Sequence, residues 1–398
     1  MINILFVDDE SNLLDALKRA TRPLRNEWCT LFANGGAEAL RVLEETPCDV
    51  IVTDMRMPGI DGLALLEAVS HRYPGMVRII FSGQCDTSTI VKAAAISHQY
   101  LSKPCDIEIL RSTVSRAVGM RKLLSSPALV QLMSAFDRIP VLPSVYSQLT
   151  LLLNDDRTSI ERIGAVIAQD MGLCAKVLQL ANSPIFGLRH PISSPEAAVG
   201  VLGFDMLKNL ALAMHVFQQY ETAIKSFDIE SLWQHSFRTS LYAANIARLV
   251  APSDSRLREQ AQVAGLLHDI GHLLLACNMP DLFERAIQLA SERGIDLFEA
   301  ERELLGASHA EVGAYVLALW GLPDEITEAI LHHHQVRSCE SRVAFAVHIA
   351  DALEYRHGSK DLPGDRHQVD VALLEERGLV DEFKSWEESC CTLHTQPS

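Results

Sequence analysis

Short apolar runs in the first third of the chain constrain its fold more than any other feature. Residues 4–7 and 50–52 are continuous apolar runs, which are typical of central strands in a parallel sheet that helices cover on both faces. Amphipathic stretches with helical periodicity separate five such runs. The pattern predicts an α/β domain with five parallel strands. The expected strands cover residues 3–7, 29–33, 50–53, 77–82 and 99–101.

The character of the sequence changes after residue 121, where turn signals become fewer and β-branched runs disappear. Helical periodicity then continues from about residue 143 to about residue 357, with prolines marking the breaks between helices. We therefore expect four segments, which are an α/β domain over 1–120, a linker helix over 121–138, an all-α domain over 139–357 and a C-terminal extension over 358–398. The extension should contain a short helix near residues 369–384 and be partly disordered, because its final segment is polar.

Composition narrows the class of protein. A chain of 398 residues with 48% hydrophobic residues can form two or three folding units. The formal net charge is −16 and no cluster of Lys and Arg is visible, which argues against binding to DNA. The nine cysteines lack CxxC spacing, which favours reduced thiols over a disulfide framework or a structural zinc site. With no visible secretory signal or transmembrane run, we expect a cytoplasmic protein without membrane contact.

Polar residues stand at the carboxyl ends of several predicted strands. Asp8 and Asp9 follow the first strand, Asp54 follows the third, Ser82 closes the fourth and Lys103 follows the fifth. Because the carboxyl ends of parallel strands meet at one edge of a sheet, these groups should form one site. Three carboxylates beside an ammonium group favour a hard cation such as Mg²⁺. The pattern predicts Asp54 as the nucleophile of a phosphoryl transfer, with Lys103 and Ser82 holding the phosphoryl oxygens.

Four stretches of this domain resemble the signature of response-regulator receiver domains. They are VDDE at 7–10, TDMRMPGIDG at 53–62, FSGQ at 81–84 and YLSKP at 100–104. The resemblance covers residues 1 to about 120 and implies a flavodoxin-like fold. It also implies that Asp54 accepts phosphate from a sensor histidine kinase or a phosphotransfer protein. The alternative is a receiver that folds but is never phosphorylated.

The same resemblance assigns roles to individual residues. The implied magnesium ligands are Asp8, Asp9, Asp54 and the main-chain carbonyl of Arg56. Lys103 would ligate the phosphoryl group. Ser82 and Tyr100 correspond to the switch positions, where the hydroxyl moves toward the phosphate and the aromatic ring turns inward.

The helical domain carries a second set of motifs. Its first half contains IPVLPSV at 139–145, QDMGLCAKVLQLANSPIFG at 169–187 and SSPEAAVGVLGFDMLKNLAL at 193–212. Its second half contains GLLHDIGHLLL at 265–275, GASHAEVGAYVLALWGLP at 306–323, AILHHHQ at 329–335 and AVHIADALEY at 346–355. These stretches resemble the HDOD family and, in the second half, its relative the HD phosphohydrolase fold.

The HD resemblance implies a metal site. In that pattern a lone His, a His-Asp pair and a later Asp ligate a divalent metal, and the corresponding residues are His235, His268, Asp269 and Asp351. His309, His333 and His334 match further ligand positions of multi-metal relatives. Imidazole and carboxylate ligands of this kind suit iron, manganese or zinc. The alternative is a degenerate site in which each histidine only hydrogen-bonds a neighbour.

Several departures argue against catalysis. HD-GYP cyclic-di-GMP phosphodiesterases carry Lys after their HDIG motif, Glu after the paired histidines and then a GYP loop. This chain has His272, Gln335 and the stretch 336–338 (Val-Arg-Ser) at those places. We therefore expect the output domain to act through protein contacts. The alternative is a receiver-gated, metal-dependent phosphohydrolase that acts on a cyclic dinucleotide or another nucleotide.

The expected partners follow from these resemblances. Besides the phosphate donor, a downstream protein partner of unknown identity should bind the output domain. Receivers often dimerise through the face that contains their fourth and fifth strands, so a homodimer is a further expected assembly. Neither DNA nor a membrane is an expected partner.

Overall fold

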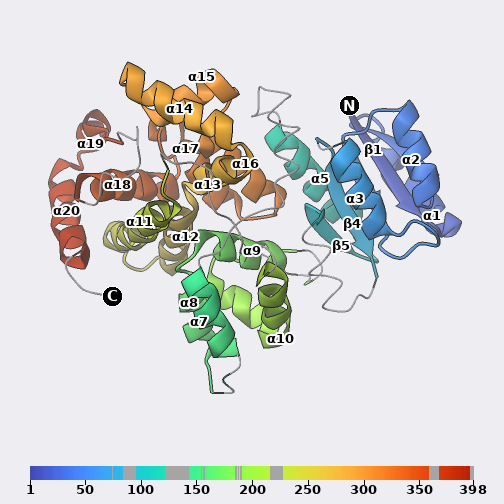
Figure 1. Cartoon of the computed structure of the whole chain (residues 1–398), viewed down its shortest axis with the longest axis horizontal. Helices are drawn as coiled ribbons and strands as arrows, with labels where there is room; N and C mark the ends of the chain where they lie inside the picture. Colours follow the sequence, from blue (N-terminus) through green and yellow to red (C-terminus); the bar gives the residue numbers. More distant parts are fainter. Residues whose placement is uncertain are drawn as a thin grey trace. The chain divides into compact units, whose positions relative to one another are not determined.

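A computed structural model describes most of the chain. The described residues are 1–73, 75–83, 96–121, 143–153, 155, 157–183, 186, 188, 191–215, 227–357 and 367–394. The chain folds into two compact units, one built on a sheet and one built of helices. Figure 1 shows the two kinds of architecture along the chain.

The first unit is built on a five-stranded parallel sheet with the order β2-β1-β3-β4-β5. Its strands are β1 (Ile2–Asp8), β2 (Trp28–Asn34), β3 (Val50–Thr53), β4 (Val77–Ser82) and β5 (Gln99–Ser102). All five predicted strands are confirmed, with shifts of one residue at some ends. In the register, Val7 pairs with Thr53, so Asp8 and Asp54 emerge side by side at the same edge.

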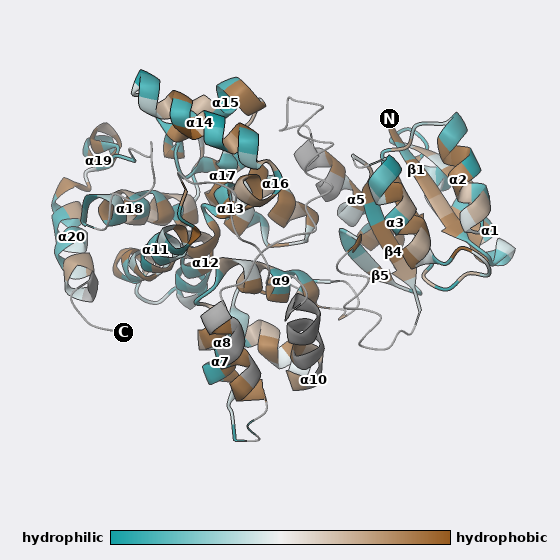
Figure 2. Cartoon of the chain, viewed as in Figure 1, coloured by the Kyte–Doolittle hydropathy of each residue, from teal (hydrophilic) through white to brown (hydrophobic). Residues whose placement is uncertain are grey.

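Helices cover both faces of this sheet. The described helical elements are α1 (Ser11–Thr21), η1 (Arg22–Leu24), α2 (Gly36–Glu45), α3 (Gly62–Arg72) and α5 (Ile107–Arg121). Leu5 and Val7 of β1 pack in one cluster with residues of α2 and α3. Ile4 and Phe6 point to the opposite face and are also fully buried, which explains the uninterrupted apolar run of β1 (Figure 2).

The second unit is helical, as predicted. Its elements up to residue 357 are α7 (Pro143–Leu153), α8 (Ile160–Ile167), α9 (Met171–Ala181), α10 (Pro195–His215), α11 (Ile229–Val250), α12 (Ser255–Leu267), α13 (Ile270–Asn278), α14 (Pro280–Arg293), α15 (Leu297–Leu305), α16 (His309–Leu319), α17 (Asp324–His332), η3 (Val336–Ser338) and α18 (Arg342–His357). Helices α11, α12 and α18 pack against one another. Pro195, Pro280 and Pro323 stand at helix starts, as the sequence indicates.

The C-terminal extension is more ordered than the sequence indicates. It contains two helices, α19 (Val371–Arg377) and α20 (Val380–His394), where one short helix ending near residue 384 is expected. The final segment is expected to be disordered because it is polar, whereas in the structure α20 extends to His394. Trp386 and Cys390, one helical turn apart on α20, are buried, and α20 packs against α11 and α18.

Parts of the expected linker helix and of the expected C-terminal extension lie outside the described residues. Residue 121 ends α5, whereas residues 122–138 of the expected linker helix lie outside the described residues, as do 358–366 and 395–398 of the extension. The boundaries between the four expected segments therefore stay predictions. No helix in the described ranges combines the length and the apolar character needed to cross a membrane.

Candidate functional site

Lys103 joins the two central carboxylates at the edge of the sheet. Its Nζ lies 2.6 Å from Asp8 Oδ2 and 2.6 Å from Asp54 Oδ1. Burial by itself lowers the pKa of Lys103, but the hydrogen bonds to Asp54 and Asp8 outweigh it, and the net pKa is raised. The ammonium group therefore stays charged and neutralises part of the negative charge that the strand ends bring together.

The turn after β3 fixes the orientation of Asp54. The second carboxylate oxygen, Oδ2, accepts a hydrogen bond of 2.9 Å from the backbone N–H of Arg56. A Cβ on Gly62 would lie 2.1 Å from the carbonyl oxygen of Asp54, so only glycine permits this close approach. Asp61 caps α3 by accepting a hydrogen bond from the N–H of Ala64. Gly62 and Asp61 are thus structural supports of the site.

The remaining predicted receiver residues lie at the same edge of the sheet. Ser82 closes β4 and is buried, whereas Asp9 is exposed directly after Asp8. Tyr100 on β5 is 5% exposed, and its hydroxyl donates to the carbonyl oxygen of Gly83 at 3.4 Å. The aromatic ring at the expected switch position is therefore turned inward in this structure. Gln84 of the FSGQ motif lies outside the described residues.

A second concentration of polar groups lies inside the helical unit, where the HD pattern predicts it. We define the first cluster as His235 of α11, His268 and Asp269 between α12 and α13, and Asp351 of α18. His235 Nε2 lies 3.2 Å from His268 Nε2, 3.5 Å from Asp269 Oδ2 and 3.2 Å from Asp351 Oδ1. His268 Nε2 lies 3.3 Å from Asp269 Oδ2 and 3.6 Å from Asp351 Oδ1.

These separations suit the coordination sphere of one metal ion. When two ligand atoms each lie about 2.1 Å from an ion and the angle between them at the ion is right or tetrahedral, the two atoms are about 3.0–3.4 Å apart. The five distances in the first cluster, 3.2–3.6 Å, lie close to this range. All four residues are at most 5% exposed. The first cluster therefore has the donor types and spacing of a transition-metal site.

Asp269 also faces a second group of imidazoles. We define the second cluster as His309 at the start of α16 and His333 and His334 after α17. Asp269 Oδ1 lies 3.5 Å from His309 Nε2 and 3.7 Å from His333 Nε2. His309 Nε2 and His334 Nε2 are 2.9 Å apart. The three histidines meet the spacing of a metal-ligand group, with Asp269 between the two clusters.

Hydrogen bonds on the far side of each ring orient four of these histidines. The Nδ1 atoms of His268 and His333 donate to the carbonyl oxygens three residues earlier, at 2.8 and 2.7 Å. The Nδ1 atom of His309 bonds Glu301 at 2.7 Å, and that of His235 bonds Glu354. In each ring the bonded Nδ1 lies on the outer side and Nε2 faces the centre, which is the arrangement found around bound metals.

The centre of the cluster leaves polar atoms without hydrogen-bond partners. Within the described residues, Asp269 Oδ2, Asp351 Oδ1 and His333 Nε2 are buried and accept or donate no hydrogen bond. Asp269 and Asp351 have no Lys or Arg at ion-pair distance in that part of the chain, and only imidazoles face them. A buried carboxylate needs a compensating cation. The residues of the first cluster thus fit a divalent metal ion.

Glycine brings the two clusters together. A Cβ on Gly271, which follows the His-Asp pair by two residues, would lie 2.0 Å from the carbonyl oxygen of His309. Only glycine therefore lets α13 approach the start of α16 closely enough for Asp269 to face His309.

Two further histidines, His272 and His332, lie in different surroundings. His272 is buried, with Nε2 3.2 Å from Glu301 Oε1 and Nδ1 3.7 Å from Asp269 Oδ2. Burial lowers the pKa of His272, but Asp269 and Glu301 raise it to about 10. His332 is apart from both clusters, and its Nδ1 bonds the hydroxyl of Ser338.

Sequence reasoning misses four residues of this centre. Glu301 and Glu354 hold the outer nitrogens of His309 and His235, and His348 and His367 continue the row of rings beyond His334. Glu354 has a detectable signal, because it lies three residues after Asp351 on one face of α18. The sequence gives no comparable signal for His367, since this residue lies in a segment without helical periodicity.

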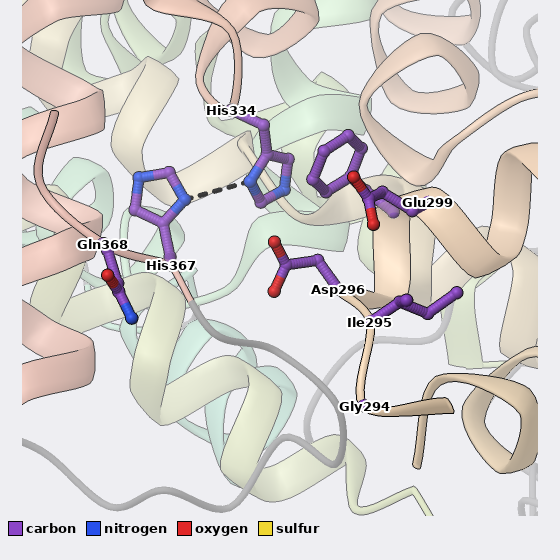
Figure 3. A pocket seen from close by; sticks show the side chains of 8 residues that line it. Gly294, Ile295, Asp296, Glu299, His334, His367 and Gln368 are labelled. Atoms are coloured by element: carbon purple, nitrogen blue, oxygen red, sulfur yellow. Dashed lines mark hydrogen bonds between the residues drawn. The ribbon is translucent and has the colours of Figure 1, made fainter. Parts of the chain in front are cut away.

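A pocket of about 500 Å³ opens beside the second cluster (Figure 3). His334 and His367 form one wall, and their Nδ1 atoms lie 2.9 Å apart. Asp296 points its carboxylate into the pocket toward these two rings, and Phe298 stacks on His334. Glu299 also lines the pocket, and none of its described lining residues is Lys or Arg. The carboxylates of Asp296 and Glu299 therefore make the described lining of the pocket more favourable for cations than for phosphate groups.

Comparisons with known proteins agree with this architecture. The family model of the response regulator receiver domain matches residues 4–115, and that of the HDOD domain matches residues 139–336. An uncharacterized protein of Treponema pallidum is 27% identical over 230 residues, which are 56% of this chain and 44% of the relative. The DNA-binding transcriptional regulator NtrC of Escherichia coli is 39% identical over 127 residues, which are 32% of this chain and 27% of the relative.

The chain spans less than half the length of these two curated relatives. Among solved structures, the MmoQ response regulator of Methylococcus capsulatus is similar to 60% of this chain and 97% of that chain, with 24% identity and a TM-score of 0.47. The two family matches cover separate parts of the chain and coincide with the sheet unit and with most of the helical unit. The chain therefore belongs to the response regulators that join an N-terminal receiver domain to a C-terminal HDOD domain.

Proposed function

We propose that Asp54 accepts a phosphoryl group from a histidine kinase or a phosphotransfer protein and that this event controls the HDOD domain. The observation that carries the proposal is the contact of Lys103 with both Asp54 and Asp8 at 2.6 Å. An ammonium group placed there neutralises charge on the oxygens that gather when a phosphoryl group joins Asp54. The backbone N–H of Arg56 holds the other oxygen of the nucleophile in place.

The acidic edge of the sheet also suits Mg²⁺. Asp8, Asp9, Asp54 and the main-chain carbonyl of Arg56 are the proposed ligands, since hard oxygen donors are what this ion prefers. When bound, Mg²⁺ would offset the charge of the carboxylates and of the incoming phosphoryl oxygens. Ser82 and Tyr100 would then act as the switch pair, with the hydroxyl of Ser82 moving toward the phosphoryl group and the ring of Tyr100 turned inward.

Phosphorylation by a small acyl phosphate tests this proposal. The wild-type protein with Mg²⁺ should gain the mass of one phosphoryl group, and Asp54→Asn should gain none. Asp15→Asn is the matched control, because Asp15 is an exposed carboxylate of the same domain, and it should behave as wild type. A phosphorylated Asp54→Asn variant, or an unmodified wild type, would contradict the assignment.

We further propose that the HDOD domain acts through protein contacts. The position where the HD-GYP enzymes carry a lysine is occupied by His272, which pairs with Glu301 in the interior. Arg337 stands where their substrate loop would be, and it bonds Asp370 and Glu376 of the same chain. Binding of a protein partner and the oligomeric state should therefore depend on a mimic of the acyl phosphate. Equal partner binding and equal assembly with and without the mimic would refute this mode of output.

A metal-dependent phosphohydrolase is the second candidate, and the geometry of the first cluster favours it. His235, His268, Asp269 and Asp351 would hold the ion, with Glu354 and the carbonyl of Gly265 orienting the two imidazoles. A divalent ion at this place would supply Lewis acidity and a nucleophilic hydroxide.

Metal content decides whether this candidate survives. Protein prepared without chelators should contain near-stoichiometric iron, manganese or zinc by elemental mass spectrometry. The double variant His268→Ala with Asp269→Ala should lose the metal, and His332→Ala, a histidine outside both clusters, should keep it. Metal-loaded protein would then be assayed on cyclic dinucleotides and other nucleotides, with and without Asp54 phosphorylation. Absence of metal in the wild type would eliminate the phosphohydrolase.

A further inference from the structure

A further set of candidate metal ligands lies beside the pocket and includes a residue of the C-terminal extension. We define the pocket-side group as His334, which follows α17, Asp351 of α18, and His367. His367 Nδ1 lies 2.9 Å from His334 Nδ1 and 3.4 Å from Asp351 Oδ2. One donor atom of each residue lies within 4.8 Å of the other two. The group therefore brings two imidazole nitrogens and one carboxylate oxygen together.

The donor atoms of this group differ from those that face the two clusters. Asp351 Oδ1 lies 3.2 Å from His235 Nε2 in the first cluster, whereas Oδ2 faces His367. A carboxylate binds ions through either oxygen, so Asp351 can serve the first cluster and the pocket-side group together. His334 faces His309 of the second cluster through Nε2 and His367 through Nδ1. A neutral imidazole binds an ion through one nitrogen, so His334 serves either the second cluster or the pocket-side group.

Negative charge around the pocket-side group favours a cation there. A distance of 2.9 Å between two imidazole nitrogens also fits a hydrogen bond, so the charge of the surroundings has to decide. Asp351 is 1% exposed, and in the described part of the chain only imidazoles face it at ion-pair distance. Asp296 points its carboxylate from the pocket toward His334 and His367 (Figure 3). Because a buried carboxylate needs a compensating cation, these charges favour an ion over a simple contact between rings.

Contacts on their far sides hold the two rings of the group. His367 Nε2 lies 3.0 Å from His348 Nδ1, and the backbone N–H of Asp370 donates to His348 Nε2 at 3.3 Å. Phe298 stacks on His334, with ring centroids 4.9 Å apart and planes inclined by 12°. Contacts of this kind orient the ligating nitrogen of a histidine toward its ion. Both Nδ1 atoms are thus held in place on the side where they face each other.

We propose that the pocket-side group binds a divalent transition-metal ion through His334 Nδ1, His367 Nδ1 and Asp351 Oδ2. Two imidazoles and one carboxylate suit zinc, iron or manganese. His334 and His367 line the pocket, so water from the pocket can fill the remaining coordination positions. His367 lies beyond residue 336, where the HDOD match ends, so one ligand of the site comes from the C-terminal extension.

This inference adds an ion to the metal-dependent candidate described above, but the pocket-side group does not require an ion in the first cluster. The four residues of the first cluster are at most 5% exposed, whereas two of the three pocket-side ligands line a pocket of about 500 Å³. The pocket-side ion should therefore exchange with solvent faster, and adding metal to the purified protein should restore it.

The number of bound ions tests the proposal. Co²⁺ binding to the metal-free, full-length protein is measured by equilibrium dialysis, and folding is checked by circular dichroism. His367→Leu should bind one equivalent fewer than wild type. His332→Leu removes a histidine outside the pocket-side group and both clusters, and it should bind as many ions as wild type. Equal binding by wild type and a folded His367→Leu variant would overturn the proposal.

A thiolate at position 367 tests the ligand directly. Co²⁺-loaded His367→Cys should gain the strong near-ultraviolet absorption of a thiolate bound to cobalt, which a merely structural role of His367 would not produce. His332→Cys, the matched control, should not gain it. A His367→Cys variant that binds as many ions as wild type without this absorption would overturn the proposal.

The two measurements also separate this site from the first cluster. If the protein binds a single ion and His367→Cys shows the absorption, the pocket-side group is supported and the first cluster is empty. If the protein binds a single ion that His367→Leu retains, the pocket-side group is refuted and the metal site of the first cluster stands.

Discussion

Arg337 holds Asp370 through a pair of hydrogen bonds, with Nη2 2.9 Å from Oδ1 and Nε bonded to Oδ2. A third group, Nη1, reaches Glu376 on α19 at 3.0 Å. This fork of guanidinium and carboxylate fixes the segment that carries His367. The arginine stands at the place where HD-GYP enzymes carry their substrate loop, so here the position serves the C-terminal extension instead.

Replacing Arg337 should loosen the extension without unfolding the domain. The side chains of Arg337 and Asp370 are 45% and 27% exposed, so the loss in global stability should be less than about 1 kcal/mol. Trypsin should nevertheless cleave after Arg377 faster in Arg337→Ala than in wild type. Arg293→Ala, which removes an exposed pair with Glu303, is the control and should leave that cleavage unchanged. Equal cleavage in all three proteins would show that the fork does not hold the extension.

The same contact should make the extension sensitive to acid. The hydrogen bond from Arg337 lowers the pKa of Asp370 below its ordinary 3.8. A lowered carboxylate pKa stabilises the folded state above the unfolded value, and this stability is lost as the pH falls through the folded value. Amide hydrogen exchange in residues 371–377, corrected for its intrinsic pH dependence, should therefore stay slow down to about pH 4 and accelerate below it. In Arg337→Ala exchange should already be faster at neutral pH, and its further acceleration below about pH 4 should be smaller, because the pKa of Asp370 then lies closer to its unfolded value. An identical profile would contradict the assigned cause.

Gly62→Ala should damage the receiver domain. The added methyl group would lie 2.1 Å from the carbonyl oxygen of Asp54, so the turn that orients the nucleophile must shift. We expect a loss of about 1–3 kcal/mol in the free energy of unfolding of this domain and slower phosphorylation by an acyl phosphate. Gly83→Ala is the matched control at the same edge of the sheet, because no atom of the described residues lies within 4 Å of an added Cβ. Comparable losses in both variants would rule out the close approach as the reason for glycine at 62.

Glu354→Gln tests how the first cluster is supported. Glu354 bonds His235 Nδ1 and also Arg238, whose Nε lies 2.6 Å from Oε1. A neutral amide is a weaker acceptor, so the affinity of the first cluster for Zn²⁺, measured by competition with a chelator, should fall by roughly 10–100-fold. Glu303→Gln removes an exposed carboxylate and should leave the affinity unchanged. Unaltered affinity in Glu354→Gln would mean that His235 is not oriented by this carboxylate.

The receiver site could be predicted almost completely, because its geometry follows from strand ends. Once five parallel strands are recognised, Asp8, Asp54 and Lys103 must meet at one edge. In the structure a carboxylate oxygen of Asp8 and one of Asp54 each lie 2.6 Å from Lys103 Nζ. What the sequence does not indicate is the support by Gly62, since the demand for glycine arises where the first residue of α3 approaches the backbone of Asp54, directly after β3.

The helical centre could be predicted only in part. The resemblance identifies the residues of both clusters, whereas His367 enters through a segment with no periodic pattern, and its place depends on the fork of Arg337 and Asp370. The helix that ends at residue 394 was also unexpected, because its few apolar residues, among them Trp386, are spaced among charged ones. This helix is ordered because a narrow apolar stripe packs against the rest of the unit, and such packing cannot be recognised from local composition.

Hydrogen exchange over the helical unit tests the central claim most directly, since the claim is that phosphorylation of Asp54 controls the HDOD domain. Exchange would be measured by mass spectrometry with Mg²⁺, with and without a beryllium fluoride mimic of the acyl phosphate, on wild type and Asp54→Asn. The account predicts that the mimic changes exchange in peptides of residues 143–357 in the wild type and leaves Asp54→Asn unaffected. Changes confined to residues 1–121 of the wild type would contradict it.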